Sequence, residues 1–318
     1  MFFPSGLLPI VAGAMVQADV PPPKPLIHKL GTLDCDMVET TPVVFSGRLY
    51  RFEYVRDNYH ANHTGQSYFR FVDVQTGQAT PAFAQGFHLG SAYVEGNTAY
   101  AYGVPAWGGS RVDVFSSQDL THWQSQTAID LPGWELFNTS VCRGPDRYVM
   151  AIEVGGPPEV VGVPFTMRFA ESNDLLNWRL LPEDAVFSKD RYTACPALRY
   201  LNGYYYMVYL EARPGPTYEE WIVRSKDLVN WEMSPLNPVL SFSDEDKVIA
   251  NPALTAAQRE RIAKAVNINN SDIDFCQFGE EVVIYYSWGN QQGVEHLAHA
   301  IYHGSLASFL EGFFPAVK

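Results

Sequence analysis

The chain has 318 residues, of which 47% are hydrophobic and 14% aromatic, so it can bury a large core and is neither disordered nor fibrous. Its formal net charge of −13 repels phosphate backbones and anionic membrane surfaces. Nucleic acid and membranes are therefore not expected partners, and the composition does not indicate an oligomeric state.

The N-terminal stretch differs in composition from the rest of the chain. Residues 2–18 are apolar enough for the core of a secretion signal, yet no Lys or Arg precedes them. The prolines at 21–23 and 25 then predict a stiff connector. We expect residues 1–25 to form an extension or signal-like segment and 26–318 to form one domain. A secreted or periplasmic location and a cytoplasmic one both remain open.

An internal repeat is the most informative feature of the sequence. The motif Ser-x-Asp-Leu-x-x-Trp ends at Trp123, Trp178 and Trp231, which stand 55 and 53 residues apart. A period of roughly 40 to 50 residues without helical periodicity is typical of four-stranded propeller blades. In each copy Ser and Asp can cap a turn, while Leu and Trp pack between blades. We expect this turn to join the third and fourth strands of a blade.

Five predicted inner hairpins give the number of blades. Each pairs two apolar or alternating runs across a polar turn, and the hairpins begin near residues 42, 90, 139, 195 and 275. The sequence therefore predicts an all-β, five-bladed β-propeller with blades at 37–83, 86–131, 134–182, 192–240 and 268–311. The first and last blades lack the repeated motif, and residues 305–310 are its degenerate candidate.

A helix is expected near residues 256–266, with Thr255 as its cap and Gln258 completing a capping box. We expect it to pack outside the ring.

The four cysteines, Cys35, Cys142, Cys195 and Cys276, lack the spacing of a zinc site. Three of them fall on inner strands of different blades. Since a disulfide requires Cα atoms within about 7 Å, we predict free, packed thiols.

Candidate site residues follow from propeller geometry. The start of each inner strand and the end of each second strand lie at the same rim of the channel. Several carboxylates fall at these positions and would repel one another unless protonated, paired or used. The catalytic candidates are Glu39, Glu211, Glu153, Asp36 and Asp272. The substrate-binding candidates are Asp274, Arg56, His88, Asn138, Trp107, Tyr192, Trp288 and Asn290. The pattern predicts no metal site and no cofactor, although the central channel leaves a structural cation possible.

Structural explanations compete with these functional ones. Glu53 also ends a second strand, but a salt bridge with Arg51 or Arg56 accounts for it equally well. Asp272 and Asp274 point the same way on a strand and fit either a pocket wall or the capping of a turn. Glu153 and Glu211 each end an apolar strand and open a Gly/Pro-rich loop, where a rigid strand positions the carboxylate.

The blade count, the repeated motif, and the hairpins that follow Thr41 and Ala194 resemble glycoside hydrolase family 43 and its five-bladed relatives, families 32, 68, 117 and 130. This resemblance covers residues 30–311. It implies an enzyme acting on an oligosaccharide or polysaccharide, with a carboxylate base on the first blade, a carboxylic acid on a later blade, and inversion at the anomeric carbon.

The sequence departs from family 43 at both acids. Thr41 stands where an Asp precedes the first-blade proline, and Cys195 stands where a Glu precedes the fourth-blade proline. Glu39 or Asp36 would then serve as base, and Glu211 or Glu153 as acid. The alternatives are a carbohydrate-binding propeller without activity and a phosphorylase or lyase. A phosphorylase would need a cluster of Arg or Lys for phosphate.

Overall fold

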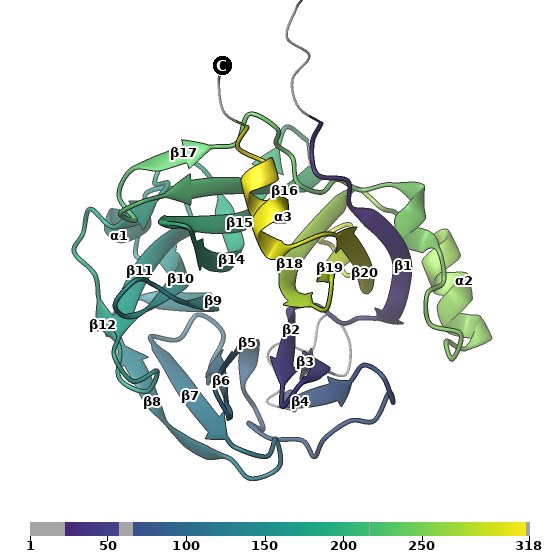
Figure 1. Ribbon diagram of the computed structural model, residues 1–318, viewed down its shortest axis with the longest axis horizontal. Coiled ribbons are helices and arrows are strands. Elements are labelled where there is room, and N and C mark those ends of the chain that lie inside the picture. Colours follow the sequence, from purple (N-terminus) through teal and green to yellow (C-terminus); the bar gives the residue numbers. More distant parts are fainter. Residues whose placement is uncertain (1–22, 57–65, 216, 316–318) are drawn as a thin grey trace, which may run out of the picture.

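A computed structural model describes residues 23–56, 66–215 and 217–315. The strands of the described residues form four sheets, one of which runs through two blades, so that the blades are arranged radially around a central axis (Figure 1). This confirms the predicted five-bladed propeller. Of the predicted N-terminal segment 1–25, residues 1–22 lie outside the described residues. Among the described residues, no helix has the length and apolar character needed to span a bilayer.

The blades follow one another along the chain, and each has its inner strand nearest the axis. Blade 1 contains β2 (Thr40–Phe45), β3 (Arg48–Val55) and β4 (Tyr68–Asp73). Blade 2 contains β5 (His88–Glu95), β6 (Thr98–Val104), β7 (Arg111–Ser117) and β8 (Gln124–Asp130). Blade 3 contains β9 (Glu135–Arg143), β10 (Tyr148–Gly156), β11 (Thr166–Ser172), β12 (Arg179–Leu180) and β13 (Val186–Phe187).

Blades 4 and 5 share one continuous sheet. Blade 4 contains β14 (Thr193–Leu201), β15 (Tyr204–Arg213), β16 (Thr217–Ser225) and β17 (Trp231–Met233). Blade 5 contains β18 (Asn269–Phe278), β19 (Glu281–Gly289) and β20 (Glu295–His303). A single parallel pairing between Tyr218 and Asn269 joins the two blades at the rim.

The N-terminal strand completes the last blade. β1 (His28–Cys35) pairs antiparallel with β20, so the two ends of the ring meet within blade 5. Lys29 on β1 lies 2.7 Å from Asp246, which is fully buried in the short 3-10 helix η2 (Asp244–Lys247). Tyr286 donates a second hydrogen bond to this carboxylate at 2.8 Å. The closure thus rests on a buried ion pair as well as on backbone hydrogen bonds.

The repeated motif forms the turn between third and fourth strands, as predicted. In blade 2, the Ser117 hydroxyl accepts the N–H of Leu120 at 2.9 Å, and Asp119 accepts that of His122 at 2.8 Å. The serines and aspartates of the other two copies make the same bonds. Leu120 adopts a φ of 60°, which its buried side chain holds in place between blades. The motif is therefore structural.

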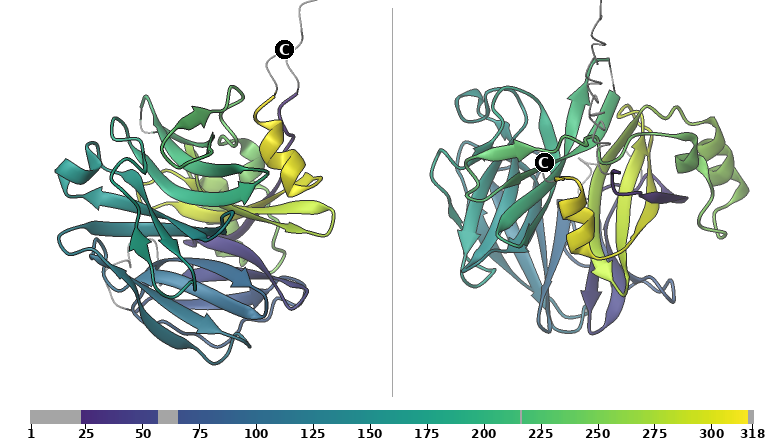
Figure 2. Two further views of the ribbon diagram at one scale, coloured as in Figure 1. Left: turned by 60° about the vertical axis from the view of Figure 1, so that its left-hand side comes forward. Right: turned by 45° about the horizontal axis from the view of Figure 1, so that its top comes forward.

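Three α-helices in the described part of the chain lie outside the sheets. The predicted helix is α2 (Ala256–Lys264), capped by Thr255 and Gln258, and it projects from the outer side of the ring (Figure 2). α1 (Pro158–Val161) is a single turn after β10. Residues 305–310 do not repeat the turn motif. Ser305 instead caps α3 (Leu306–Gly312), since β1 already supplies the fourth strand of blade 5.

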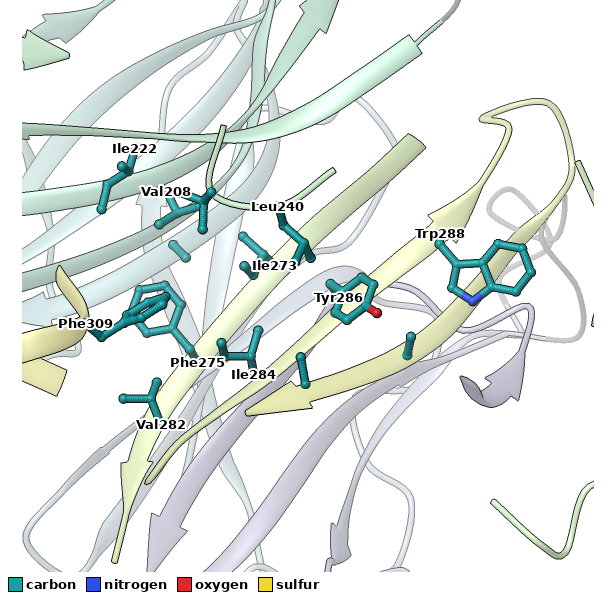
Figure 3. Packing of buried hydrophobic residues seen from close by; sticks show 14 of the residues in the cluster. Val208, Ile222, Leu240, Ile273, Phe275, Val282, Ile284, Tyr286, Trp288 and Phe309 are labelled. Atoms are coloured by element: carbon teal, nitrogen blue, oxygen red, sulfur yellow. The ribbon is translucent and has the colours of Figure 1, made fainter. Parts of the chain in front are cut away.

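The largest apolar cluster fills the space between blades 4 and 5. Val208 and Ile222 from blade 4 meet Phe275, Ile284 and Tyr286 from blade 5, as Figure 3 shows. All five side chains are fully buried. This packing fixes the relative position of the two blades, and both blades carry site residues described below.

Candidate active site

β-bulges near the N-terminal ends of the inner strands position the site. β-bulges interrupt β5, β14 and β18, and the first bulged residues adopt left-handed φ angles: 52° at Leu89, 50° at Cys195 and 55° at Asp272. Glu39, directly before β2, has a φ of 45°. Bulges bend a strand and re-aim its side chains. Here they turn one side chain per blade toward the axis.

These residues line one cavity of about 240 Å³ at the mouth of the channel. Three of the predicted catalytic residues, Glu39, Glu153 and Asp272, come together there from blades 1, 3 and 5. Four of the predicted binding residues also line it: Arg56, Trp107, Asn138 and Tyr192. The structure thus brings Glu39, Glu153 and Asp272 together in this cavity.

Glu39 holds a buried carboxyl oxygen, Oε2, that has no hydrogen-bond partner. Burial raises the pKa of Glu39 from 4.5 to about 8; the neighbouring Arg56 opposes this, and the charges of Asp272 and Glu153 add to it. At neutral pH the group therefore holds a proton. A carboxyl group that lines a cavity and holds a proton at neutral pH can act as a general acid toward a bound molecule.

Glu153 is held more firmly. Its Oε2 accepts the backbone N–H of Cys195 at 2.8 Å and the side-chain amide of Asn138 at 3.0 Å. Burial raises its pKa to about 7, although both hydrogen bonds favour the charged form and lower it. One oxygen of Glu153 is therefore already committed to the protein.

Asp272 affects the pKa values of three neighbouring carboxyl groups. Its charge contributes to the raised pKa values of Glu39, Glu153 and Glu295. Ser287 donates a hydrogen bond to Asp272 at 3.0 Å. Burial is the main cause of these raised pKa values, and the nearby charge of Asp272 adds to it.

Aromatic rings form the wall of the cavity on the side of blades 2 to 4. Trp107, Phe137, Phe165 and Tyr192 make a chain of edge-to-face contacts with centroid distances of 5.7, 4.8 and 5.6 Å. Trp107 is 39% exposed and Phe137 only 7%, so the wall runs from a rim into the core. Rings of this kind can stack on the C–H face of a sugar.

Glu211 lies outside this cavity, contrary to expectation. It follows Leu210 on β15, and because side chains alternate along a strand, Leu210 faces the cavity while Glu211 faces away. Its Oε2 accepts the Tyr209 hydroxyl at 2.9 Å and lies 3.5 Å from Arg191.

Asp36 is placed elsewhere, whereas Asp274 lines a smaller adjoining cavity together with Glu39 and Asp272; each of the two aspartates is in an ion pair. Asp36 binds Arg261 of α2 at 2.8 Å, on the outer side of blade 5. Asp274 lies deeper in the channel, beyond the bulge, where Arg199 contacts it at 2.5 Å. Glu53 likewise forms ion pairs, with Arg51 and with Arg70, which confirms its structural explanation.

Three further predicted binding residues do not line the cavity. Trp288 is fully buried in the core of blade 5 and donates to Thr32 at 2.8 Å (Figure 3). His88 is buried behind the cavity wall, 2.9 Å from the Tyr54 hydroxyl. Asn290 accepts the N–H of Gln292 and shapes the turn before β20. The Trp288 and His88 side chains are thus buried in the protein, and the Asn290 side chain bonds within its own turn.

Sequence reasoning missed Gln291 and Glu295, which also line the cavity. Glu295 begins the third strand of blade 5, and its carboxyl accepts the Gln291 N–H at 2.8 Å. Burial raises the pKa of Glu295 to about 8. Third strands start at the same rim as first strands, so extending the rim rule to them would have found this residue.

All four cysteines are free thiols. Within the described ranges, no three His, Cys, Asp or Glu side chains are grouped as metal ligands.

Comparison of the sequence with protein-family models and with curated proteins finds no match. Solved structures, by contrast, share the fold across most of the chain. A thermostable family-43 glycoside hydrolase has 14% identity and a TM-score of 0.59, covering 85% of this chain and 90% of that one. A glycosyl hydrolase from Bacteroides ovatus has 12% identity and a TM-score of 0.55, covering 83% and 84%.

An α-L-arabinanase from Cellvibrio cellulosa, complexed with arabinohexaose, has 10% identity and a TM-score of 0.53, covering 84% and 91%. Identities this low carry the fold and not the roles of residues. The chain is a divergent five-bladed β-propeller of the architecture found in these glycoside hydrolases.

Proposed function

We propose that this protein hydrolyses a glycosidic bond of an oligosaccharide or polysaccharide in the cavity at the channel mouth. The observation that carries the proposal is the juxtaposition of the protonated Glu39 with the carboxylate of Asp272 beside an aromatic wall. Glycoside hydrolysis needs this pair of groups: one acid to protonate the leaving oxygen and one carboxylate to activate water or attack the sugar.

In this proposal Glu39 is the acid and Asp272 the carboxylate, which reverses the role that the family resemblance implies for the first blade. Glu39 has the raised pKa and lines the cavity, so it can give up its proton to a bound sugar. Glu153 positions the site through its bonds to Cys195 and Asn138. Trp107 and Tyr192 contact the sugar or its leaving group.

Hydrolysis is favoured over phosphorolysis by the charges around the cavity. Arg56 is the one arginine or lysine among the described residues that line it. Two other arginines near the rim form ion pairs, Arg191 with Glu211 and Arg213 with Glu219. A phosphate co-substrate would normally find several uncommitted cations.

The experiment is release of reducing sugar from a panel of polysaccharides and aryl glycosides by the wild-type protein and by E39Q and D272N. Both variants keep the shape of the side chain and remove its proton chemistry. We expect each to lower kcat at least about 100-fold. The exposed Glu159, on α1 and outside the cavity, provides the matched control E159Q, which should keep full activity.

Wild-type rates in E39Q and D272N would overturn these roles. If the protein binds sugars of the panel but releases no reducing sugar from them, it is instead a carbohydrate-binding propeller. For an active protein, ¹H NMR of the first product anomer tests the expected inversion.

A further inference from the structure

A carboxyl group from blade 4 holds the bulge that carries Asp272. Glu220 lies on β16 and is fully buried. Its Oε1 accepts the backbone N–H of Ile273 at 3.1 Å, across the boundary between blades 4 and 5. Asp272 and Ile273 are the two bulged residues of β18, which together oppose one residue of β19. A bulge disrupts the sheet ladder, so its N–H groups depend on partners from elsewhere.

A related arrangement occurs one blade earlier, where the carboxyl group bonds to the first bulged residue and not to the second. There, Glu153 of blade 3 accepts the N–H of Cys195, the bulged residue of β14, at 2.8 Å. Both carboxyl groups come from the preceding blade, and both bond to a bulge whose first residue has a left-handed φ. A left-handed conformation in a non-glycine residue costs about 1 kcal/mol or more and persists only where its surroundings enforce it.

We propose that Glu220 is a positioning residue for Asp272: by holding the N–H of Ile273, it keeps the bulge in the conformation that turns the Asp272 carboxylate into the cavity. This inference rests on the proposed function, because it assigns Glu220 a part in the reaction of Asp272. It also has a consequence that does not depend on activity: the hydrogen bond should protect the Ile273 amide from hydrogen exchange with solvent.

The chemistry of Glu220 distinguishes this role from simple packing. Its Oε2 is buried without a hydrogen-bond partner, which costs free energy that an apolar side chain would avoid. Burial and the nearby charge of Asp272 raise its pKa well above the ordinary value, and the hydrogen bond from the Ile273 N–H opposes this rise. A neutral amide can accept the same N–H, whereas an aliphatic side chain of similar size cannot.

The test compares E220Q and E220L, with E232L as a control on the exposed outer strand β17. Circular dichroism first establishes that each variant is folded. We expect E220Q to keep kcat and KM within about threefold. We expect E220L to lose at least about tenfold in kcat with KM nearly unchanged, since small misplacements of a catalytic group are costly in rate. E232L should match the wild type.

Amide exchange followed by ¹⁵N NMR provides the second readout. In E220L the Ile273 amide should exchange about tenfold faster, the equivalent of one lost hydrogen bond of roughly 1.4 kcal/mol, while E220Q should retain the protection. Unchanged protection in E220L would overturn the anchoring hydrogen bond. Lost protection with wild-type kcat, or an equal loss of kcat in E220Q and E220L, would overturn the positioning role.

If the wild-type protein cleaves no glycoside, the proposed function fails, and the positioning of Asp272 is then judged by NMR alone. In that case the ¹³C shift of the Asp272 carboxyl should change in E220L and not in E220Q. An unchanged shift in both variants would reject the positioning role.

Discussion

The backbone N–H of Cys195 donates a 2.8 Å hydrogen bond to Oε2 of Glu153, across the boundary between blades 3 and 4. Cys195 precedes Pro196, at the position where the family resemblance would place an acid. Here the inner strand of blade 4 brings a thiol into the cavity, and the carboxyl group comes from the neighbouring blade. The thiol lies close to Asp272, and burial raises its pKa well above the ordinary value. The acid-base chemistry of the cavity therefore falls to its carboxyl groups.

The pH profile should report the proton on Glu39. Because Glu39 acts as an acid in our proposal and its pKa is about 8, kcat/KM should fall as the pH rises through that value. In E39Q the remaining activity should lose this alkaline limb. Rate measurements between pH 5 and 10 on a cleaved aryl glycoside test this. If kcat/KM of E39Q still falls at the same alkaline pH, another group is responsible for that fall.

Stability should also depend on the buried acids. Glu39 and Glu295 have pKa values of about 8 in the folded protein against an ordinary 4.5, so the folded state binds protons that the unfolded chain has released. The free energy of unfolding should therefore decrease as the pH rises from about 5 to about 8. Thermal unfolding at both pH values should show Tm lower by a few degrees at pH 8.

The same scans on E39Q should show a smaller decrease, since Gln does not titrate. E159Q, at an exposed position, should keep the wild-type slope. A Tm that rises toward pH 8 would contradict the raised pKa values.

Trp107 should contribute to substrate binding more than to folding. Its ring is 39% exposed and packs edge-to-face on Phe137 at the cavity rim. We expect W107A to raise KM about three- to tenfold, as the loss of one aromatic contact predicts, with little change in Tm. F242A is the control, because Phe242 has a similar exposure of 40% and does not line the cavity. An equal effect of both substitutions on KM would argue against a contact with substrate.

The closure of the ring should depend on Asp246. Removing this carboxylate leaves Lys29 buried without its counter-ion, so D246A should lower the free energy of unfolding by about 3 to 5 kcal/mol. Asp244, in the same short helix, is exposed, and D244A should change the free energy of unfolding by less than about 0.5 kcal/mol. Urea unfolding measures both variants. A small effect of D246A would mean that the backbone pairing of β1 closes the ring unaided.

The cysteines should be reduced and slow to react. Burial raises the pKa of Cys35 to about 11 and those of Cys142 and Cys276 to about 12. Since the thiolate is the reactive form, a disulfide reagent should modify the native protein slowly and should find four thiols in denaturant. Two or fewer thiols in denaturant would reveal a disulfide.

The sequence by itself determined the fold, because the features that specify it are local and repeated. Each copy of the turn motif bonds to its own backbone within three residues, as Ser117 does with Leu120, so its meaning can be read without the rest of the chain. The capping box of α2 is local in the same way. The β1 strand was missed because its partner, β20, is more than 260 residues away, and no local pattern marks that pairing.

Only the tertiary structure decided which rim residues face the cavity. The rim rule placed Glu153 and Glu211 at equivalent heights, but strand alternation and the bulges turn Glu153 inward and Glu211 away. A bulge inserts one residue and reverses the facing of those that follow, and whether it forms depends on partners such as Glu220 from another blade. Such long-range contacts arise from packing between blades and leave no mark in the local sequence.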